Sequence, residues 1–246
     1  MCGRYALVSQ PQELAAEFEF AAPIEIRPRY NIAPTQEVPV VRLDDAALPA
    51  APDGAPRRPV VRQAEAGGGR RLDVLRWGLI PHWAQDPKIA YRTINARSET
   101  VATQPAFRGP FRRRRCLVPA SGFFEWRKSD AAGRQPKQPH YVRRKDGRPM
   151  AFAGLWDRWQ RADGDAIESF TILTTEANAL VRPCHDRMPV ILSPEHYDLW
   201  LDPQTPIERL RPLLAPCPAQ WLEMVPVGRR VNNPRNDDSS CIVPLS

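Results

Sequence analysis

The sequence predicts an α+β fold: a single domain built on a mixed, mostly antiparallel, barrel-like β-sheet that is flanked by short helices. Apolar alternation outlines about eight or nine short strands, and capping residues with apolar spacing outline about four or five short helices. These elements do not follow the regular strand–helix–strand order that builds a parallel sheet. Proline occurs 28 times in 246 residues, and it limits regular elements because it lacks a backbone N–H donor.

The first half of the chain contains short predicted elements separated by turns. Ser9 is expected to cap the first helix, with Pro11 near its first turn. Ser98 is expected to cap a short helix that runs toward Gln104. The elements predicted here are strands over residues 6–8, 37–43 and 72–79 and a helix over residues 12–20.

The second half contains most of the predicted strands. A loop over residues 128–138, rich in Lys, Gly and Gln, separates the first two strands from the others. The elements predicted here are strands over residues 116–118, 121–126, 140–143, 150–156, 169–175 and 221–227, one helical turn over 177–181, and helices over 194–201 and 206–214.

One domain spanning residues 1–246 is expected, because the chain shows neither an internal repeat nor a linker that would separate two cores. Residues 44–71 are rich in Ala, Pro, Gly and Arg and are expected to form a surface insertion, with a short strand at 59–62. Residues 228–246 form a polar tail that is expected to be loosely held.

Charge and cysteine content limit the classes of partner. The formal net charge is +7, from 35 Lys and Arg against 28 Asp and Glu, which favours nucleic acid over a membrane as the partner. No apolar run of about 18 residues is present, and no signal peptide is expected. The five cysteines form no C-x-x-C pair, which predicts a reduced, cytoplasmic protein without a metal site. No nucleotide-cofactor motif occurs, so no cofactor is expected.

The amino-terminal stretch Met1-Cys2-Gly3-Arg4-Tyr5 carries a distinctive pair of nucleophiles. Once Met1 is removed, Cys2 presents an α-amine and a thiol on adjacent carbons. The amine, whose ordinary pKa is about 7.7–8, can condense with an aldehyde to form an imine. The thiol can then add to the imine carbon and close a thiazolidine ring. The alternative is that Cys2 has no chemical role.

Few other side chains suggest chemistry. Glu125 lies within the aromatic run 123–126, where desolvation would raise its pKa and suit it to acid–base work. Strand alternation leaves open whether this carboxylate faces water or the interior. His185 lies in a loop between Cys184 and Asp186, and Asn95 lies in a turn. Each of these two residues has an equally simple interpretation as a surface or turn residue.

The basic run Arg112–Arg115 is the clearest electrostatic feature. It fits a solvated face, and with Phe107, Phe111, Trp83 and Trp126 elsewhere in the chain it also fits a phosphate groove with stacking platforms. No H-E-x-x-H, G-x-S-x-G or deaminase-type cysteine pair occurs, which argues against a catalytic zinc or an α/β-hydrolase.

Six short motifs occur together and in order. They are Cys2-Gly3-Arg4-Tyr5, Tyr30-Asn31-Ile32-Ala33-Pro34, Arg76-Trp77-Gly78-Leu79-Ile80-Pro81, Ile94-Asn95-Ala96-Arg97-Ser98-Glu99-Thr100, Gly122-Phe123-Phe124-Glu125-Trp126 and His185-Asp186-Arg187-Met188-Pro189. With these motifs the chain resembles, nearly end to end, the SRAP (SOS-response-associated peptidase) family, whose members shield abasic sites in single-stranded DNA.

The resemblance implies a covalent mechanism. The α-amine of Cys2 would attack C1′ of the opened abasic deoxyribose, and the thiol would close a thiazolidine crosslink. Asn95 would position the Cys2 terminus, Glu125 would transfer protons during imine formation, and His185 would act at the sugar oxygen. The same resemblance places DNA contacts at Arg4, Pro34, Trp83, Arg97, Trp126, Thr174 and Arg187.

The resemblance also implies a setting: a monomer that acts on abasic single strands, associated with replication forks and, in a bacterium, with the nucleoid. Two other functions stay open. Cys2 with Asn95, Glu125 and His185 fits an N-terminal-cysteine peptidase or amidohydrolase, including one that removes its own Met1. The second alternative is a non-covalent single-strand-binding module with an inert Cys2. Its affinity for DNA would be the same with and without abasic sites.

Overall fold

Five strands close into a barrel, which confirms the predicted α+β class with its mixed, mostly antiparallel sheet. The computed structural model describes residues 2–20, 25–44, 69–127, 137–160 and 164–245. The strand order around the barrel is β10-β4-β3-β6-β9, and β9 pairs with β10 to close the ring. The β10–β4 pair is parallel, and the other pairs are antiparallel. These strands are β3 (Glu37–Leu43), β4 (Arg70–Trp77), β6 (Arg115–Ala120), β9 (Met150–Gln160) and β10 (Ala166–Glu176).

Three short strands extend the barrel sheet at its rim. β5 pairs in parallel with β10, whereas β11 pairs antiparallel with β10 and β12 with β9. Their bounds are β5 (Asn95–Arg97), β11 (Arg187–Pro189) and β12 (Ile191–Leu192). Both β5 and β11 therefore meet the carboxyl end of β10, where two of the six sequence motifs come together.

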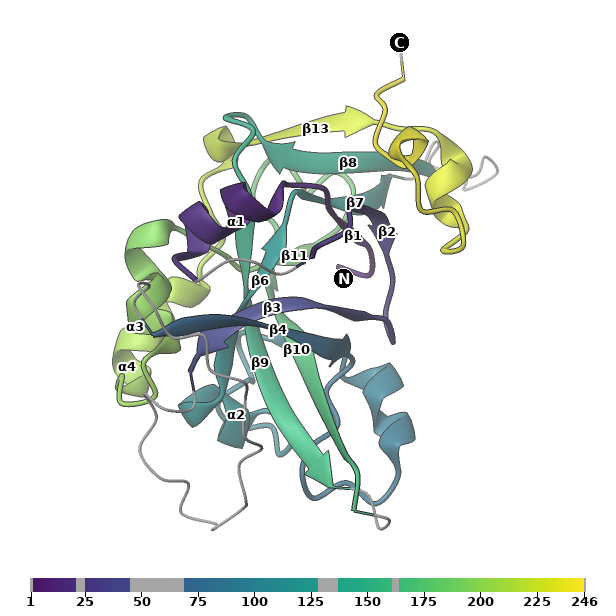
Figure 1. Ribbon diagram of the computed structural model, residues 1–246. Helices are drawn as coiled ribbons and strands as arrows, with labels where there is room; N and C mark the ends of the chain where they lie inside the picture. Colours follow the sequence, from purple (N-terminus) through teal and green to yellow (C-terminus); the bar gives the residue numbers. More distant parts are fainter. Residues whose placement is uncertain (1, 21–24, 45–68, 128–136, 161–163, 246) are drawn as a thin grey trace.

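A second sheet of five strands packs over the barrel in the order β13-β8-β7-β1-β2, with every neighbouring pair antiparallel. Figure 1 shows β8 and β13 along one edge of the molecule, and β1 and β2 between them and the barrel strands. The strands are β1 (Tyr5–Leu7), β2 (Arg29–Ile32), β7 (Gly122–Arg127), β8 (Gln138–Arg144) and β13 (Leu222–Pro226).

The helices are short and lie at the edges of the sheets. The first begins after Gln10, not Ser9, because the Glu13 carboxylate accepts a hydrogen bond from the Gln10 N–H. The helix expected after Ser98 is a series of turns that leads into α2. The α-helices are α1 (Pro11–Phe18), α2 (Arg108–Arg113), α3 (Tyr197–Leu201) and α4 (Ile207–Leu210); 3₁₀ turns include η2 (Pro87–Arg92) and η6 (Arg229–Asn232).

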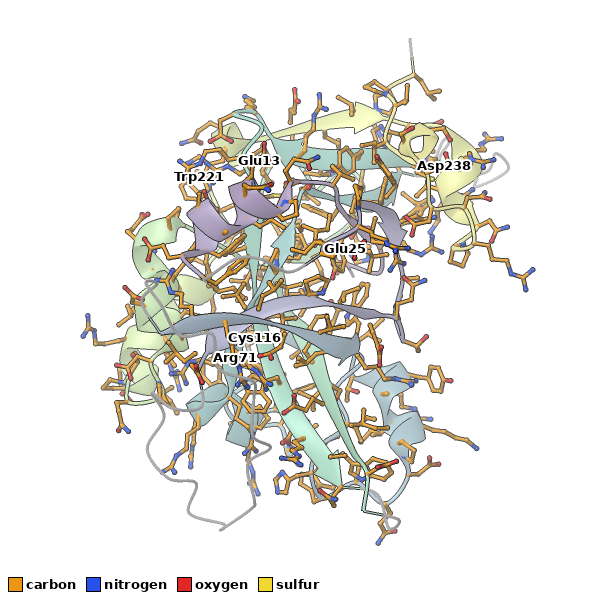
Figure 2. All side chains as sticks on the ribbon, in the orientation of Figure 1. Glu13, Glu25, Arg71, Cys116, Trp221 and Asp238 are labelled. Atoms are coloured by element: carbon orange, nitrogen blue, oxygen red, sulfur yellow. The ribbon has the colours of Figure 1, made fainter. Side chains whose placement is uncertain are left out.

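One large apolar core fills the barrel and the space under the second sheet, and Figure 2 shows Cys116 toward its middle. Tyr5 of β1 packs edge-on against both Trp77 and Phe152 of the barrel, with ring centroids 5.3 and 5.9 Å apart. The amino-terminal strand is thus anchored in the interior. No helix in the described ranges is both long and apolar enough to cross a membrane.

The carboxy-terminal segment is hydrogen-bonded to β2, so the expectation of a loosely held tail is wrong. The Asn31 side chain donates to the carbonyls of Val231, Asn233 and Asn236, at 3.1, 3.0 and 2.8 Å. The Asp237 carboxylate accepts from the backbone N–H of Asn31 at 2.9 Å. Figures 1 and 2 show this segment, which carries Asp238, beside β2 and β8. Most of the predicted insertion, residues 45–68, lies outside the described residues.

Candidate functional site

Cys2 is carried into the interior by the pairing of β1. Tyr5 lies opposite Ile32 of β2 and Phe123 of β7, and the Phe124 N–H donates to the Arg4 carbonyl at 3.0 Å. Continuing this register would place Gly3 opposite Glu125. Cys2 itself is fully buried, and this burial raises the pKa of its thiol far above the usual range; the nearby Glu125 charge raises it further.

Asn95 reaches the Cys2 backbone from the barrel rim. Its side-chain Nδ2 donates to the Cys2 carbonyl at 2.9 Å. The Asn95 Oδ1 atom is buried and has no hydrogen-bond partner in the described part of the chain. Gly78 allows the turn that follows β4 on the way to Asn95. Its φ of 117° lies in the region that favours glycine, and a Cβ there would lie 2.7 Å from the Ala90 carbonyl oxygen.

Glu125 faces the interior beside Cys2. Only 3 % of the residue is exposed, so water stabilises the ionised carboxylate only weakly. Burial raises the pKa of this carboxyl to about 7, and the Asp186 charge acts in the same direction. The Glu125 charge in turn raises the pKa of the half-buried Cys184 thiol, after burial itself. Cys2, Glu125, Cys184 and Asp186 therefore share one electrostatic neighbourhood.

His185 lies in the turn between β10 and β11, next to this group. The Arg187 backbone N–H donates to His185 Nδ1 at 2.9 Å, and Asp186 Oδ1 lies 2.7 Å from the same nitrogen. One nitrogen cannot both accept from Arg187 and donate to Asp186. Desolvation lowers the pKa of His185, which favours the neutral ring. The bond from Arg187 uses Nδ1 as an acceptor, whereas the contact with Asp186 requires a proton on Nδ1, so the two contacts select different tautomers.

Arg187 is buried and held by protein groups. Its guanidinium pairs with both Glu99 oxygens, at 2.5 and 3.0 Å, and donates to the Thr174 carbonyl. Thr174 is fully buried, and its carbonyl also accepts from the Ser98 N–H at 2.9 Å. These contacts tie the turn after β5 to β10 and β11. Asn95 lies on β5, and His185 lies just before β11. The predicted phosphate contacts at Arg187 and Thr174 stay predictions.

Arg4, two residues after Cys2, is half-buried. Its Nη1 donates to Asn31 Oδ1 and to the Val231 carbonyl, both at 2.7 Å. Trp126 Nε1 donates to Asn232 Oδ1 at 2.8 Å. The carboxy-terminal segment thus fixes two predicted DNA contacts and the amino-terminal motif together. Asn31 is the organising residue, and the sequence offered only its place in the second motif as a signal.

The other predicted DNA contacts lie at the surface, and the basic run does not act as a unit. Trp83 is 51 % exposed, Arg97 is exposed and Pro34 is half-buried. Within the run, Arg112 and Arg113 are exposed, and Arg114 pairs with Asp157 at 3.2 Å. Arg115 is buried, and its guanidinium donates to the Phe111, Arg112, Trp200 and Asp202 carbonyls.

The site is a set of proton donors and acceptors around a buried terminus. In the described residues no three His, Cys, Asp or Glu side chains are grouped so as to hold a metal ion. Cys184, whose Sγ lies 3.5 Å from Met224 Sδ, is a second thiol beside the site, and sequence reasoning had not selected it. A buried cysteine, an amide on its carbonyl, a carboxyl with a raised pKa and a neutral imidazole suit carbonyl chemistry at an amino terminus.

The chain belongs to the SOS response associated peptidase (SRAP) family, whose model matches residues 1–234. It is 37 % identical over 246 residues to the abasic site processing protein YoqW of Bacillus subtilis, covering 98 % of this chain and 99 % of that protein. It is 31 % identical over 255 residues to the abasic site processing protein YedK of Escherichia coli, covering 100 % of both. A solved structure of a Bacteroides thetaiotaomicron protein matches with a TM-score of 0.82 and 25 % identity, covering 100 % of both chains.

Proposed function

We propose that this protein processes abasic sites in single-stranded DNA by covalent capture at Cys2. The observation that carries the proposal is the buried Cys2, bound by Asn95 at its carbonyl and adjacent to the Glu125 carboxyl with a pKa of about 7. The names of the relatives support the substrate, since they are abasic site processing proteins. Family membership supports a role in DNA damage and repair.

Removal of Met1 frees the α-amine, which adds to C1′ of the ring-opened sugar and forms a carbinolamine. Loss of water gives the imine, and the Cys2 thiol then adds to C1′ while its proton passes to nitrogen, which closes the thiazolidine. No oxidant or reductant is consumed. A carboxyl with a pKa of about 7 is divided between its two protonation states near neutral pH. Glu125 can therefore accept a proton from the ammonium and return one to the departing hydroxyl.

Asn95 and His185 have separate roles in the proposal. The unpartnered Asn95 Oδ1 would accept a hydrogen bond from the Cys2 α-amine and aim its lone pair at C1′. His185, whose pKa is lowered by burial, would donate to the sugar ring oxygen as the ring opens and take the proton back when the crosslink is released. Arg4, Arg97 and the exposed Trp83 would contact the strand on either side.

Peptide hydrolysis is a weaker candidate. A cysteine peptidase attacks with a thiolate, whereas burial keeps the Cys2 thiol protonated by raising its pKa. The aldehyde reaction begins with the amine and uses the thiol only in an intramolecular ring closure. Association with replication forks and a monomeric state stay predictions.

One denaturing gel tests the proposal. Mature protein, shown by mass spectrometry to lack Met1, is incubated with a labelled single strand that carries one abasic site and is then heated in detergent. We expect a heat-stable shifted band with wild type and no such band with Cys2→Ala. Cys184→Ala is the matched control, because it removes the other thiol close to Glu125, and it should keep the band. A stable band from Cys2→Ala would show that the nucleophile lies elsewhere.

A further inference from the structure

A pocket of about 230 Å³ lies beside the segment that connects β4 to β5. This volume is below the ~300–1,000 Å³ of sites for drug-sized ligands, so it suits one ring system and not a whole cofactor. Both walls come from well-formed elements, namely η2 on one side and the β9–β10 hairpin on the other. The lining residues are Arg76, Ile80, Pro87, Lys88, Tyr91, Trp159 and Ile167.

The pocket combines aromatic rings with cations. Tyr91 is 64 % exposed, whereas the Trp159 ring is fixed by a 2.6 Å hydrogen bond from its Nε1 to the Ala84 carbonyl. Arg76 Nε is buried without a hydrogen-bond partner among the residues that the structure describes. Lys88 is exposed on η2. An aromatic face for a base and cations for its phosphate are the two elements of single-strand recognition.

The pocket lies within reach of a strand that passes Cys2. Arg76 is opposite Ser169 on β10, and Asn95 is opposite Ile172 on the same strand. Three residues along a strand span about 10 Å, at roughly 3.3 Å per residue, and this odd separation puts the Arg76 and Asn95 side chains on opposite faces of the sheet. Trp83 lies in the connecting segment and Arg97 at the end of β5, and both are exposed. A single strand whose lesion lies at Cys2 would therefore have to turn around this edge of the sheet to bring a neighbouring nucleotide to the pocket.

We propose that this pocket is a second nucleotide subsite that takes an unpaired base of the lesion-bearing strand. The base stacks on Tyr91, and its phosphate pairs with Arg76 and Lys88. The inference rests on the proposed function, because the strand is held by the abasic site at Cys2. It adds a contact on one side of the lesion only, so the protein reads the strand in one direction.

Equilibrium binding separates this subsite from the covalent step. Fluorescence anisotropy is measured with single strands that carry a tetrahydrofuran abasic analogue, which has no aldehyde, and whose 5′ or 3′ flank is lengthened in steps. Wild-type affinity should rise when one of the flanks reaches the pocket. Tyr91→Ala should lose roughly 5- to 100-fold on strands with that flank and bind the shortest strands like wild type. Because Tyr91 is exposed, its removal should leave folding intact.

Charge is tested with a matched pair of exposed lysines. Lys88→Gln should lower the salt dependence of binding by about 0.7 in log–log slope, as expected for one phosphate contact on a single strand. Lys145→Gln, in the β8–β9 turn, makes the same charge change away from the pocket and should not lower it. If Tyr91→Ala binds every strand like wild type, the subsite is refuted while the crosslinking result stands. A wild type that neither binds nor crosslinks any strand would refute the proposed function and the subsite with it.

Discussion

Replacing Glu125 with glutamine should make the folded protein more stable than wild type at pH 8. Most of this gain in stability should be absent at pH 4.5. Burial raises the pKa of the carboxyl from an ordinary 4.5 to about 7. Between these values the folded protein holds a proton that the unfolded chain has released, so wild-type stability falls as pH rises and the full cost is present above pH 7. At about 1.4 kcal/mol for each pH unit, this cost is about 3 kcal/mol. Glutamine carries no charge and avoids it.

Urea unfolding of wild type and Glu125→Gln at the two pH values measures this cost directly. The stability difference between the proteins should be about 3 kcal/mol larger at pH 8 than at pH 4.5, or about 6–12 °C in Tm for a chain of this size. Groups common to both proteins cancel in the comparison. Glu208→Gln, at an exposed position of α4, is the matched control. A stability difference that is the same at both pH values would show that the carboxyl is not held at a raised pKa.

Two further predictions concern the supports of the site. Arg97→Gln should lower the salt dependence of single-strand binding by about 0.7 in log–log slope. Arg187→Gln should keep the slope and lower the unfolding free energy by about 1–3 kcal/mol, because Glu99 loses its partner. An equal drop in slope for both variants in salt titrations would assign Arg187 to phosphate binding. Asn31→Ala should cost about 2 kcal/mol in urea unfolding, because the two amide N–H groups that three carbonyls of the carboxy-terminal segment share are lost. Proteolysis that leaves this segment as resistant as in wild type would contradict that role.

Short-range patterns predicted the longer strands, but they predicted neither the short strands β2, β5, β11 and β12 nor how the barrel closes. The expected strands at 150–156 and 169–175 extend in the structure to Met150–Gln160 and Ala166–Glu176. Their added length places Trp159 opposite Ile167 in a long hairpin. Closure depends on β10 pairing with β4 as well as with β9, and pairing between segments so far apart in the chain leaves no local signature.

Alternation was unable to orient Glu125 for a physical reason. Phe123 packs into the main core, and Phe124 packs into a second cluster with Tyr141. Both faces of β7 are therefore covered, so neither face marks the solvent side. The carboxy-terminal segment was misjudged for a related reason. Its backbone carbonyls accept hydrogen bonds from the buried Asn31 amide, and polar composition alone does not show whether a segment is hydrogen-bonded to water or to the protein.

The link between the two ends of the chain has a consequence for biosynthesis. Arg4 contacts Val231, a separation of 227 residues, and the site itself needs Asn95, Glu125 and His185 from three intermediate regions. Contacts of such long range form slowly, because loop-closure entropy must be overcome first. A nascent chain on the ribosome therefore has Cys2 long before it has the residues that surround Cys2 in the folded protein. In the proposed function, capture of an abasic site would therefore wait until synthesis has passed the residues that hold Arg4 in place.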